Sequence, residues 1–117
     1  MADILSNVRE VLTTNHASVT VDNTYKYAYR YGNIVYIKAK ITVSEDIDAS
    51  GGTQNLLSTS YKPFINSPFL TILNSESPYT EASKAYVFVG TSVNSIRIYH
   101  TTLPAGTYFI TGSYICE

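Results

Sequence analysis

Hydrophobic and polar residues alternate along most of the chain after residue 17. In the stretch YKYAYRYGNIVYIKAKITV, tyrosines occupy every second position from Tyr25 to Tyr31, and after a Gly-Asn pair apolar residues do so from Val35 to Val43. A period of two is typical of β-strands that bury one face. This pattern, bounded by turn residues, predicts eight strands, at residues 17–21, 24–31, 34–44, 54–59, 68–74, 84–90, 95–101 and 107–116.

A helical pattern precedes these strands. Apolar residues at positions 4, 5, 8, 11 and 12 fall on one side of a helix of about three turns, with Asp3 as its N-cap. The chain therefore divides into a helical segment, residues 1–16, and one β domain, residues 17–117. So short a helix is marginal alone, and we expect its stripe to dock on the domain or on equivalent helices of other subunits.

The number and length of the strands predict the fold class. Eight short strands in one domain favour an all-β fold, an antiparallel β-sandwich of jelly-roll-like topology with a short N-terminal helix. The chain has 117 residues, of which 44% are hydrophobic, near the size at which one core is sufficient. Cys116 is the single cysteine, so packing or self-association rather than an internal disulfide must hold the fold.

The Gly32-Asn33 turn allows two registers for its hairpin. A two-residue turn pairs Tyr29 with Tyr36 and places the tyrosines on the face of the lysines that follow. A three-residue loop, residues 31–33, instead aligns Tyr29 with Val35 and segregates apolar from charged residues. Because burial of large side chains outweighs the differences between turn types, we predict the second register, with the tyrosines mainly in the core and their hydroxyls at its rim or at a subunit contact.

Charge and hydropathy exclude several classes of partner. Eight Lys and Arg against nine Asp and Glu give a net charge of -1, so neither nucleic acid nor an anionic membrane surface is an expected partner. No apolar stretch is long enough to span a bilayer, and the first residues lack the basic and apolar regions of a secretion signal. Membrane insertion is not expected.

Side chains that carry out chemistry are few and scattered. His16 and His100 occur without metal-ligand spacing, no G-x-S-x-G motif holds a serine, and Cys116 belongs to the apolar face of the last strand. The carboxylates of Glu45, Asp46 and Asp48 offer oxygen ligands of the kind that Ca²⁺ prefers, but their spacing fits no EF-hand and is interpreted as a solvated loop. We expect neither an enzyme nor a metal or cofactor site.

Two polar surfaces are candidates for ligand binding. The long connection at residues 74–83 carries Tyr79 between Glu76 and Glu81, and loops on rigid β scaffolds often carry recognition. Strand 95–101 places Arg97 and Tyr99 on one face, with His100 beside them, and arginine with tyrosine binds phosphates or sugars. The same residue types occur at subunit contacts and on ordinary solvated loops.

Three segments, YRYGNIVYIKAKITV, TSYKPF and AYVFVGTSVNSIRIYHTTLPAGTYFITGSYICE, carry a family resemblance over roughly residues 24–117. They resemble the C-terminal head domains of phage tail fibres, baseplate receptor-binding proteins and related prophage tail proteins. The shared features are a Gly-Asn turn, a Tyr-Lys-Pro step and a terminal strand beginning Ala-Gly-Thr-Tyr. One departure is that this chain contains no tryptophan, the residue most favoured for stacking on sugars.

The resemblance implies a homotrimeric head, located in the virion as part of a phage tail and made in the bacterial cytoplasm, that binds a host cell-surface saccharide or teichoic acid without catalysis. In such a trimer we expect the helix near the three-fold axis or against a neighbouring subunit. We expect weak saccharide binding in clefts between protomers, by Tyr79 with Glu76 and Glu81 and by Arg97 with Tyr99 and His100. The alternative function is a purely structural trimerisation or fibre-capping module that has no ligand of its own.

Overall fold

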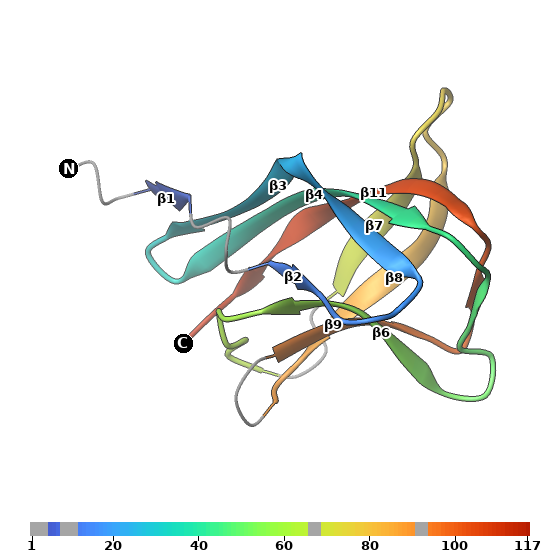
Figure 1. Cartoon of the computed structure of the whole chain (residues 1–117). Helices are drawn as coiled ribbons and strands as arrows, with labels where there is room; N and C mark the ends of the chain where they lie inside the picture. Colours follow the sequence, from blue (N-terminus) through green and yellow to red (C-terminus); the bar gives the residue numbers. More distant parts are fainter. Residues whose placement is uncertain (1–4, 8–11, 66–68, 91–93) are drawn as a thin grey trace.

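The chain folds into one strongly curved antiparallel sheet in a computed structural model that describes residues 5–7, 12–65, 69–90 and 94–117. Nine strands lie in the order β1-β3-β4-β11-β7-β8-β9-β6-β2 (Figure 1), and β5 pairs with β10 in a separate ribbon. The strands are β1 (Leu5–Asn7), β2 (Thr13–Thr14), β3 (Val19–Tyr31), β4 (Ile34–Val43), β5 (Ile47–Asp48), β6 (Thr53–Thr59), β7 (Phe69–Asn74), β8 (Glu81–Phe88), β9 (Asn94–Tyr99), β10 (Thr102–Leu103) and β11 (Gly106–Ile115). Because β2 at one edge contacts β3 near the other, the sheet is nearly closed.

The predicted all-β class is confirmed, and each of the eight predicted strands has a counterpart. The first two predicted strands are the two ends of β3, which is one strand with an irregular register between Val21 and Lys26. The short strands β1, β2, β5 and β10 were not predicted, because two or three residues are too few to establish a period of two. Within the described residues, nine strands belong to one curved sheet, and β5 and β10 form a second sheet of two strands.

The predicted N-terminal helix is wrong where the structure describes that segment. Leu5–Asn7 form strand β1, antiparallel to the end of β3, and Thr13–Thr14 form strand β2. Leu12 is fully buried in the core of the domain. A helix of about three turns is marginal without packing, whereas the edge of β3 offers ready hydrogen-bond partners to the backbone of these residues. Residues 3, 4 and 8–11 of the predicted helix lie outside the described residues.

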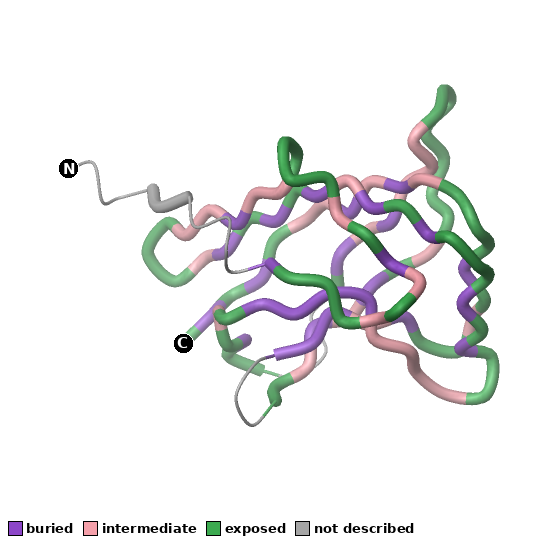
Figure 2. The backbone as a smooth tube through the Cα atoms, viewed as in Figure 1, coloured by how far each residue is buried: buried purple, intermediate pink, exposed green. Residues whose placement is uncertain are grey.

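The inner face of the curved sheet forms the core. Buried and exposed residues alternate along the long strands (Figure 2), as a period of two requires. This face is lined mainly by valine, isoleucine, leucine and alanine side chains that are shielded from water. The largest fully buried side chains are Leu12, Ile37, Ile41, Ile47, Leu56, Leu57, Leu70, Ile72, Ile96, Ile98, Leu103 and Ile110.

The predicted three-residue loop between β3 and β4 is wrong, and so is the burial of the tyrosines that depended on it. Tyr31 pairs with Ile34 and Tyr29 with Tyr36, so Gly32-Asn33 form a two-residue turn, and the φ of +60° at Gly32 suits it. Strand β4 supplies most of the buried apolar residues of this hairpin, and in the half of β3 that carries the tyrosines only Ala28 is buried opposite them. The tyrosines therefore lie on the outer face.

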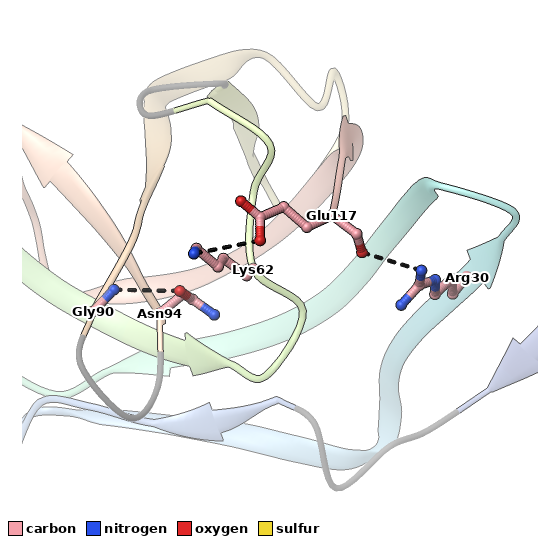
Figure 3. Close-up of polar contacts among 5 residues, drawn as sticks. All are labelled: Arg30, Lys62, Gly90, Asn94 and Glu117. Atoms are coloured by element: carbon pink, nitrogen blue, oxygen red, sulfur yellow. Dashed lines mark hydrogen bonds and ion pairs between the residues drawn. The ribbon is translucent and has the colours of Figure 1, made fainter.

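Arg30 is compatible with the inner side of β3 because it sits at the open end of the sheet. Its Nε donates to the Gly32 carbonyl at 2.8 Å and its Nη2 to the Glu117 carbonyl at 3.1 Å. Figure 3 shows Glu117 between Arg30 and Lys62, whose Nζ lies 3.3 Å from Glu117 Oε1. In the same view Asn94 accepts a hydrogen bond from the Gly90 amide at 3.2 Å. The guanidinium of Arg30 therefore bonds to backbone carbonyls at the end of the sheet and is not buried in the core.

Tyr114 ties the last strand to the segment that follows β6. Its hydroxyl donates to the Tyr61 carbonyl at 2.7 Å and lies 3.2 Å from Thr59 Oγ1. The side chain is buried, and this burial raises the pKa of Tyr114 to about 12 from an ordinary value of 10.0. The protonated form is therefore the one that the folded state stabilises.

Alkaline pH is expected to destabilise the protein through this residue. Below pH 10 the hydroxyl is protonated in both states, and the stabilisation is fully present. Between pH 10 and about 12 the unfolded chain ionises while folded Tyr114 stays protonated, so stability falls by about 2 to 3 kcal/mol. Urea titrations at pH 8 and pH 12 measure this loss, and Tyr114→Phe should remove that part of it. An equal alkaline loss in both proteins would contradict the assignment.

Candidate functional site

The loop between β7 and β8 carries the first predicted group and projects from one end of the molecule (Figure 1). Asn74 closes its base, because the Asn74 amide donates to the Thr80 carbonyl at 2.9 Å and its Nδ2 to Thr80 Oγ1, also at 2.9 Å. The Tyr79 amide donates to the Glu76 carbonyl at 2.8 Å, and Tyr79 has a φ of +54°. Tyr79 is exposed at the tip, as a recognition residue would be.

Glu81 does not join Tyr79 and Glu76 in one cluster. It begins strand β8, where its Oε1 lies 2.8 Å from Lys84 Nζ. The hydrogen bond from Lys84 to Glu81, followed by their opposite charges, raises the pKa of Lys84 above its usual range. Both side chains are about half exposed, so the pair contributes little to stability and instead fixes the position of a lysine on the outer face.

The second predicted group lies on the outer face of β9, within a larger row of aromatic rings. Tyr99 packs edge-on against Tyr86 of β8, with ring centroids 6.0 Å apart, and Tyr86 packs against Phe69 of β7 at 6.3 Å. His100 continues the row, with its ring 4.2 Å from that of Tyr99. Because the three strands are neighbours, the outward residues Phe69, Tyr86 and Tyr99 form one continuous surface.

Two cations flank these rings. The Arg97 guanidinium carbon lies 4.3 Å from the centre of the Phe88 ring, while Nε and Nη2 donate to Ser95 Oγ at 3.0 and 2.8 Å. Lys84 Nζ lies 5.1 Å from the centre of the Phe69 ring. Such cation–ring contacts hold long side chains in place on a surface. We call this surface the β7–β9 strip, made of Phe69, Lys84, Tyr86, Phe88, Arg97 and Tyr99.

The structure brings Arg97, Tyr99 and His100 together but separates them from the loop group. Arg97 pairs with Tyr86, near the end of β8. Tyr79 precedes Glu81, at the start of the same strand. Phe69, Tyr86 and Phe88 were not predicted, because they belong to strands whose order in the sheet does not follow from a linear pattern. The available signal was alternation, since Phe69 stands next to buried Leu70, and Tyr86 and Phe88 stand on either side of buried Val87.

A second aromatic surface lies on the outer face of β3. The tyrosine row consists of Tyr25, Tyr27, Tyr29 and Tyr31. Tyr27 and Tyr29 are stacked, with centroids 5.5 Å apart and planes 10° from parallel, and Tyr25 contacts Phe109 of β11 at 5.4 Å. This row is the part of the candidate surface that the incorrect hairpin register had placed inside the protein.

The acidic loop and the remaining reactive side chains serve local structure. Asp46 accepts a hydrogen bond from the Ala105 amide at 2.8 Å, and Asp48 from the Ser50 amide at 2.9 Å. The hydrogen bonds to Ser50 and then that to Thr102 lower the pKa of Asp48. His16 Nδ1 accepts from the Ser18 amide at 3.0 Å. Among the described residues no three His, Cys, Asp or Glu side chains are grouped as metal ligands.

Cys116 is buried, as its position on the apolar face of the last strand predicted. In the described ranges the chain has no helix of the length and apolarity that a bilayer crossing requires. No family model, curated protein or solved structure matches this chain.

Proposed function

We propose that this chain is a non-enzymatic receptor-binding head domain of a phage or prophage tail, assembled as a homotrimer in the virion and attached to saccharide on the host cell surface. The observation that supports this proposal is the β7–β9 strip, an exposed row of aromatic rings held between two cations. The jelly-roll-like topology of such heads remains part of the proposal.

The chemistry of the strip favours a sugar polymer that carries negative charge. Aromatic ring faces stack on the apolar faces of sugars. Because this chain has no tryptophan, tyrosine and phenylalanine would provide these rings. Arg97 and Lys84 add positive charge, which suits the phosphates of a teichoic acid or the carboxylates of an acidic glycan. Phe69 and Tyr99 are 53% and 46% exposed, so a ligand reaches their rings without a change of fold.

Affinity at one such surface is expected to be low. The strip lies on the outside of a curved sheet and buries only one side of a ligand, whereas tight small-ligand sites enclose most of it. Each copy should bind in the millimolar to micromolar range. Useful adhesion then comes from several copies on one tail, where the first contact raises the effective concentration of the next.

The alternative is a structural trimerisation or fibre-capping module without its own ligand. The tyrosine row favours it, because tyrosine is enriched at protein contacts. Tyr31 of this row is 53% exposed, and Tyr36, on the same outer face in β4, is 44% exposed. The two functions place the important tyrosines on different strands. Substitutions on β9 and on β3 therefore distinguish them.

Tyr99→Ala is expected to reduce adsorption of the purified protein to host cells at least tenfold, because it removes the ring at the end of the strip, a loss of about 1.4 kcal/mol. Arg97→Ala should act in the same direction. Tyr31→Ala is the matched control, an equally exposed tyrosine outside the strip. Adsorption of labelled protein and solution mass by light scattering are measured for all three variants.

The outcome assigns one function or the other. If Tyr99→Ala and Arg97→Ala lose adsorption while Tyr31→Ala keeps both its adsorption and its mass, the adhesion function is supported. If Tyr31→Ala lowers the mass while the β9 variants behave like the native chain, the protein is a structural module and the adhesion proposal is wrong. Tyr79→Ala, tested alongside, decides whether the loop tip contributes.

A further inference from the structure

A polar groove runs along one end of the molecule, away from the β7–β9 strip. Its first part has a volume of about 550 Å³ and lies between the β7–β8 loop and the start of β11. Its second part, about 440 Å³, lies between the irregular part of β3 and β4. Ser75 and Thr107 line both parts, so the two hollows adjoin. Each part falls within the range of small-ligand sites, roughly 300 to 1,000 Å³.

Serine and threonine are the most frequent residues in the walls of this groove. They come from four different segments of the chain, which the fold brings to one end of the sheet. The contributing residues are Thr20, Thr42, Ser75, Ser77, Thr80 and Thr107. A hydroxyl both donates and accepts, so a wall of hydroxyls complements a ligand that is itself rich in hydroxyls.

The charged groups of the groove are mixed in sign. Asp22 and Lys40 line the second part, and Glu76 lines the first. Hydrogen bonds from Thr24 to the Asp22 carboxylate, through Oγ1 at 2.7 Å and the amide at 2.9 Å, lower the pKa of Asp22, so it stays ionised at neutral pH. Two carboxylates against one ammonium disfavour a polyanion, which the strip accommodates instead.

Hydrogen bonds of the backbone and of side chains hold the groove in shape. The Ser75 amide donates to the Thr107 carbonyl at 3.3 Å, which joins the β7–β8 loop to β11. Asn74 closes the base of the same loop through Thr80, and Tyr108 donates its hydroxyl to the Pro104 carbonyl at 2.6 Å on the opposite wall. A preformed site loses less entropy when it binds.

We infer that this groove binds a neutral saccharide, as a second ligand site beside the strip. The inference rests on the proposed saccharide adhesion and adds to it a distinct place and ligand class. The carboxylates of Asp22 and Glu76 accept hydrogen bonds from pairs of sugar hydroxyls, Lys40 donates, and the wall hydroxyls do both. With the strip binding acidic sugar polymer, one head engages two kinds of unit on the same cell surface.

Thr107→Tyr tests the inference, because Thr107 lines both hollows and the larger side chain occupies space in each of them. Thr111→Tyr is the matched control: the same change on the same face of β11, four residues away and outside the groove. Ser75→Tyr repeats the block from the loop, in case β11 does not tolerate the first change. The probes are maltose, lactose and N,N′-diacetylchitobiose as neutral sugars, and poly(glycerol phosphate) as the polyanion.

The measurement is titration of isotope-labelled protein followed by amide chemical shifts. At least one neutral sugar should shift the amides of Ser75 and Thr107, with affinity reduced at least tenfold by Thr107→Tyr or Ser75→Tyr and changed less than twofold by Thr111→Tyr. The polyanion should shift the amides of Tyr86 and Tyr99 in every variant. Neutral sugars that shift no groove amide, or that bind the blocked variants equally well, overturn the inference and leave the proposed function standing if the polyanion still binds the strip.

Discussion

Replacing Ile110 by alanine is expected to lower the free energy of unfolding by about 2 to 5 kcal/mol. Ile110 is fully buried at the middle of β11, where it pairs with Ala39 of β4 and Ile72 of β7. Truncation removes apolar contacts and leaves a cavity. The flanking strands are held in register by hydrogen bonds on both sides of β11, so the cavity does not collapse.

Ile115→Ala is the matched control, because Ile115 lies on the same strand but is 54% exposed. Its cost should stay within about 0.5 kcal/mol, as for most surface substitutions. Urea titrations of both variants give the comparison, with the dependence on urea expected to be unchanged. Equal losses at the two positions would mean that the inner face of β11 is not the core of the folded protein.

Gly112→Ala is expected to destabilise the protein by a similar amount, about 2 to 5 kcal/mol. Gly112 has a φ of +147°, a backbone conformation that residues with a Cβ rarely adopt. A Cβ built there lies 3.0 Å from Leu70 Cδ2 and 3.3 Å from Leu70 Cα, so Leu70 of β7 must move by a few tenths of an ångström to accommodate it. Backbone strain and overpacking therefore add.

Gly52→Ala provides the comparison for this second variant. A Cβ at Gly52 meets nothing within 4 Å, and its φ is not positive. The substitution should be close to neutral or slightly stabilising, because alanine reduces the freedom of the unfolded chain. If Gly112→Ala unfolds at the same urea concentration as Gly52→Ala, the close approach of β11 to β7 is not maintained in solution.

Only part of the candidate site was available from the sequence. Arg97 and Tyr99 were predicted to share a face because residues two apart in a strand do so, and the structure confirms this placement. Phe69 and Tyr86 join them through lateral strand pairing, which depends on the order of strands and not on spacing along the chain. The groove was missed for the same reason, since its walls come from β3, β4, the β7–β8 loop and β11.

Sequence alone located the seven long strands of this protein. Alternation with a period of two is a local property, fixed by the geometry of the extended chain, and it located β3, β4, β6, β7, β8, β9 and β11 to within a few residues. The alternating buried residues of β4 and the burial of Cys116 followed from the same pattern. So did the assignment of the chain to the all-β class.

Tertiary structure decided which face of each strand is buried and what the first residues do. The period of two does not say which of its two faces points inward, and the tyrosines looked more costly to expose than Lys26 and Arg30 were to bury. In the folded chain β4 fills the core opposite Ala28, Arg30 reaches carbonyls at the rim, and the rings cover one another outside. Leu5–Asn7 likewise pair with the edge of β3, because a short helix is marginal without packing and the open strand edge supplies hydrogen-bond partners.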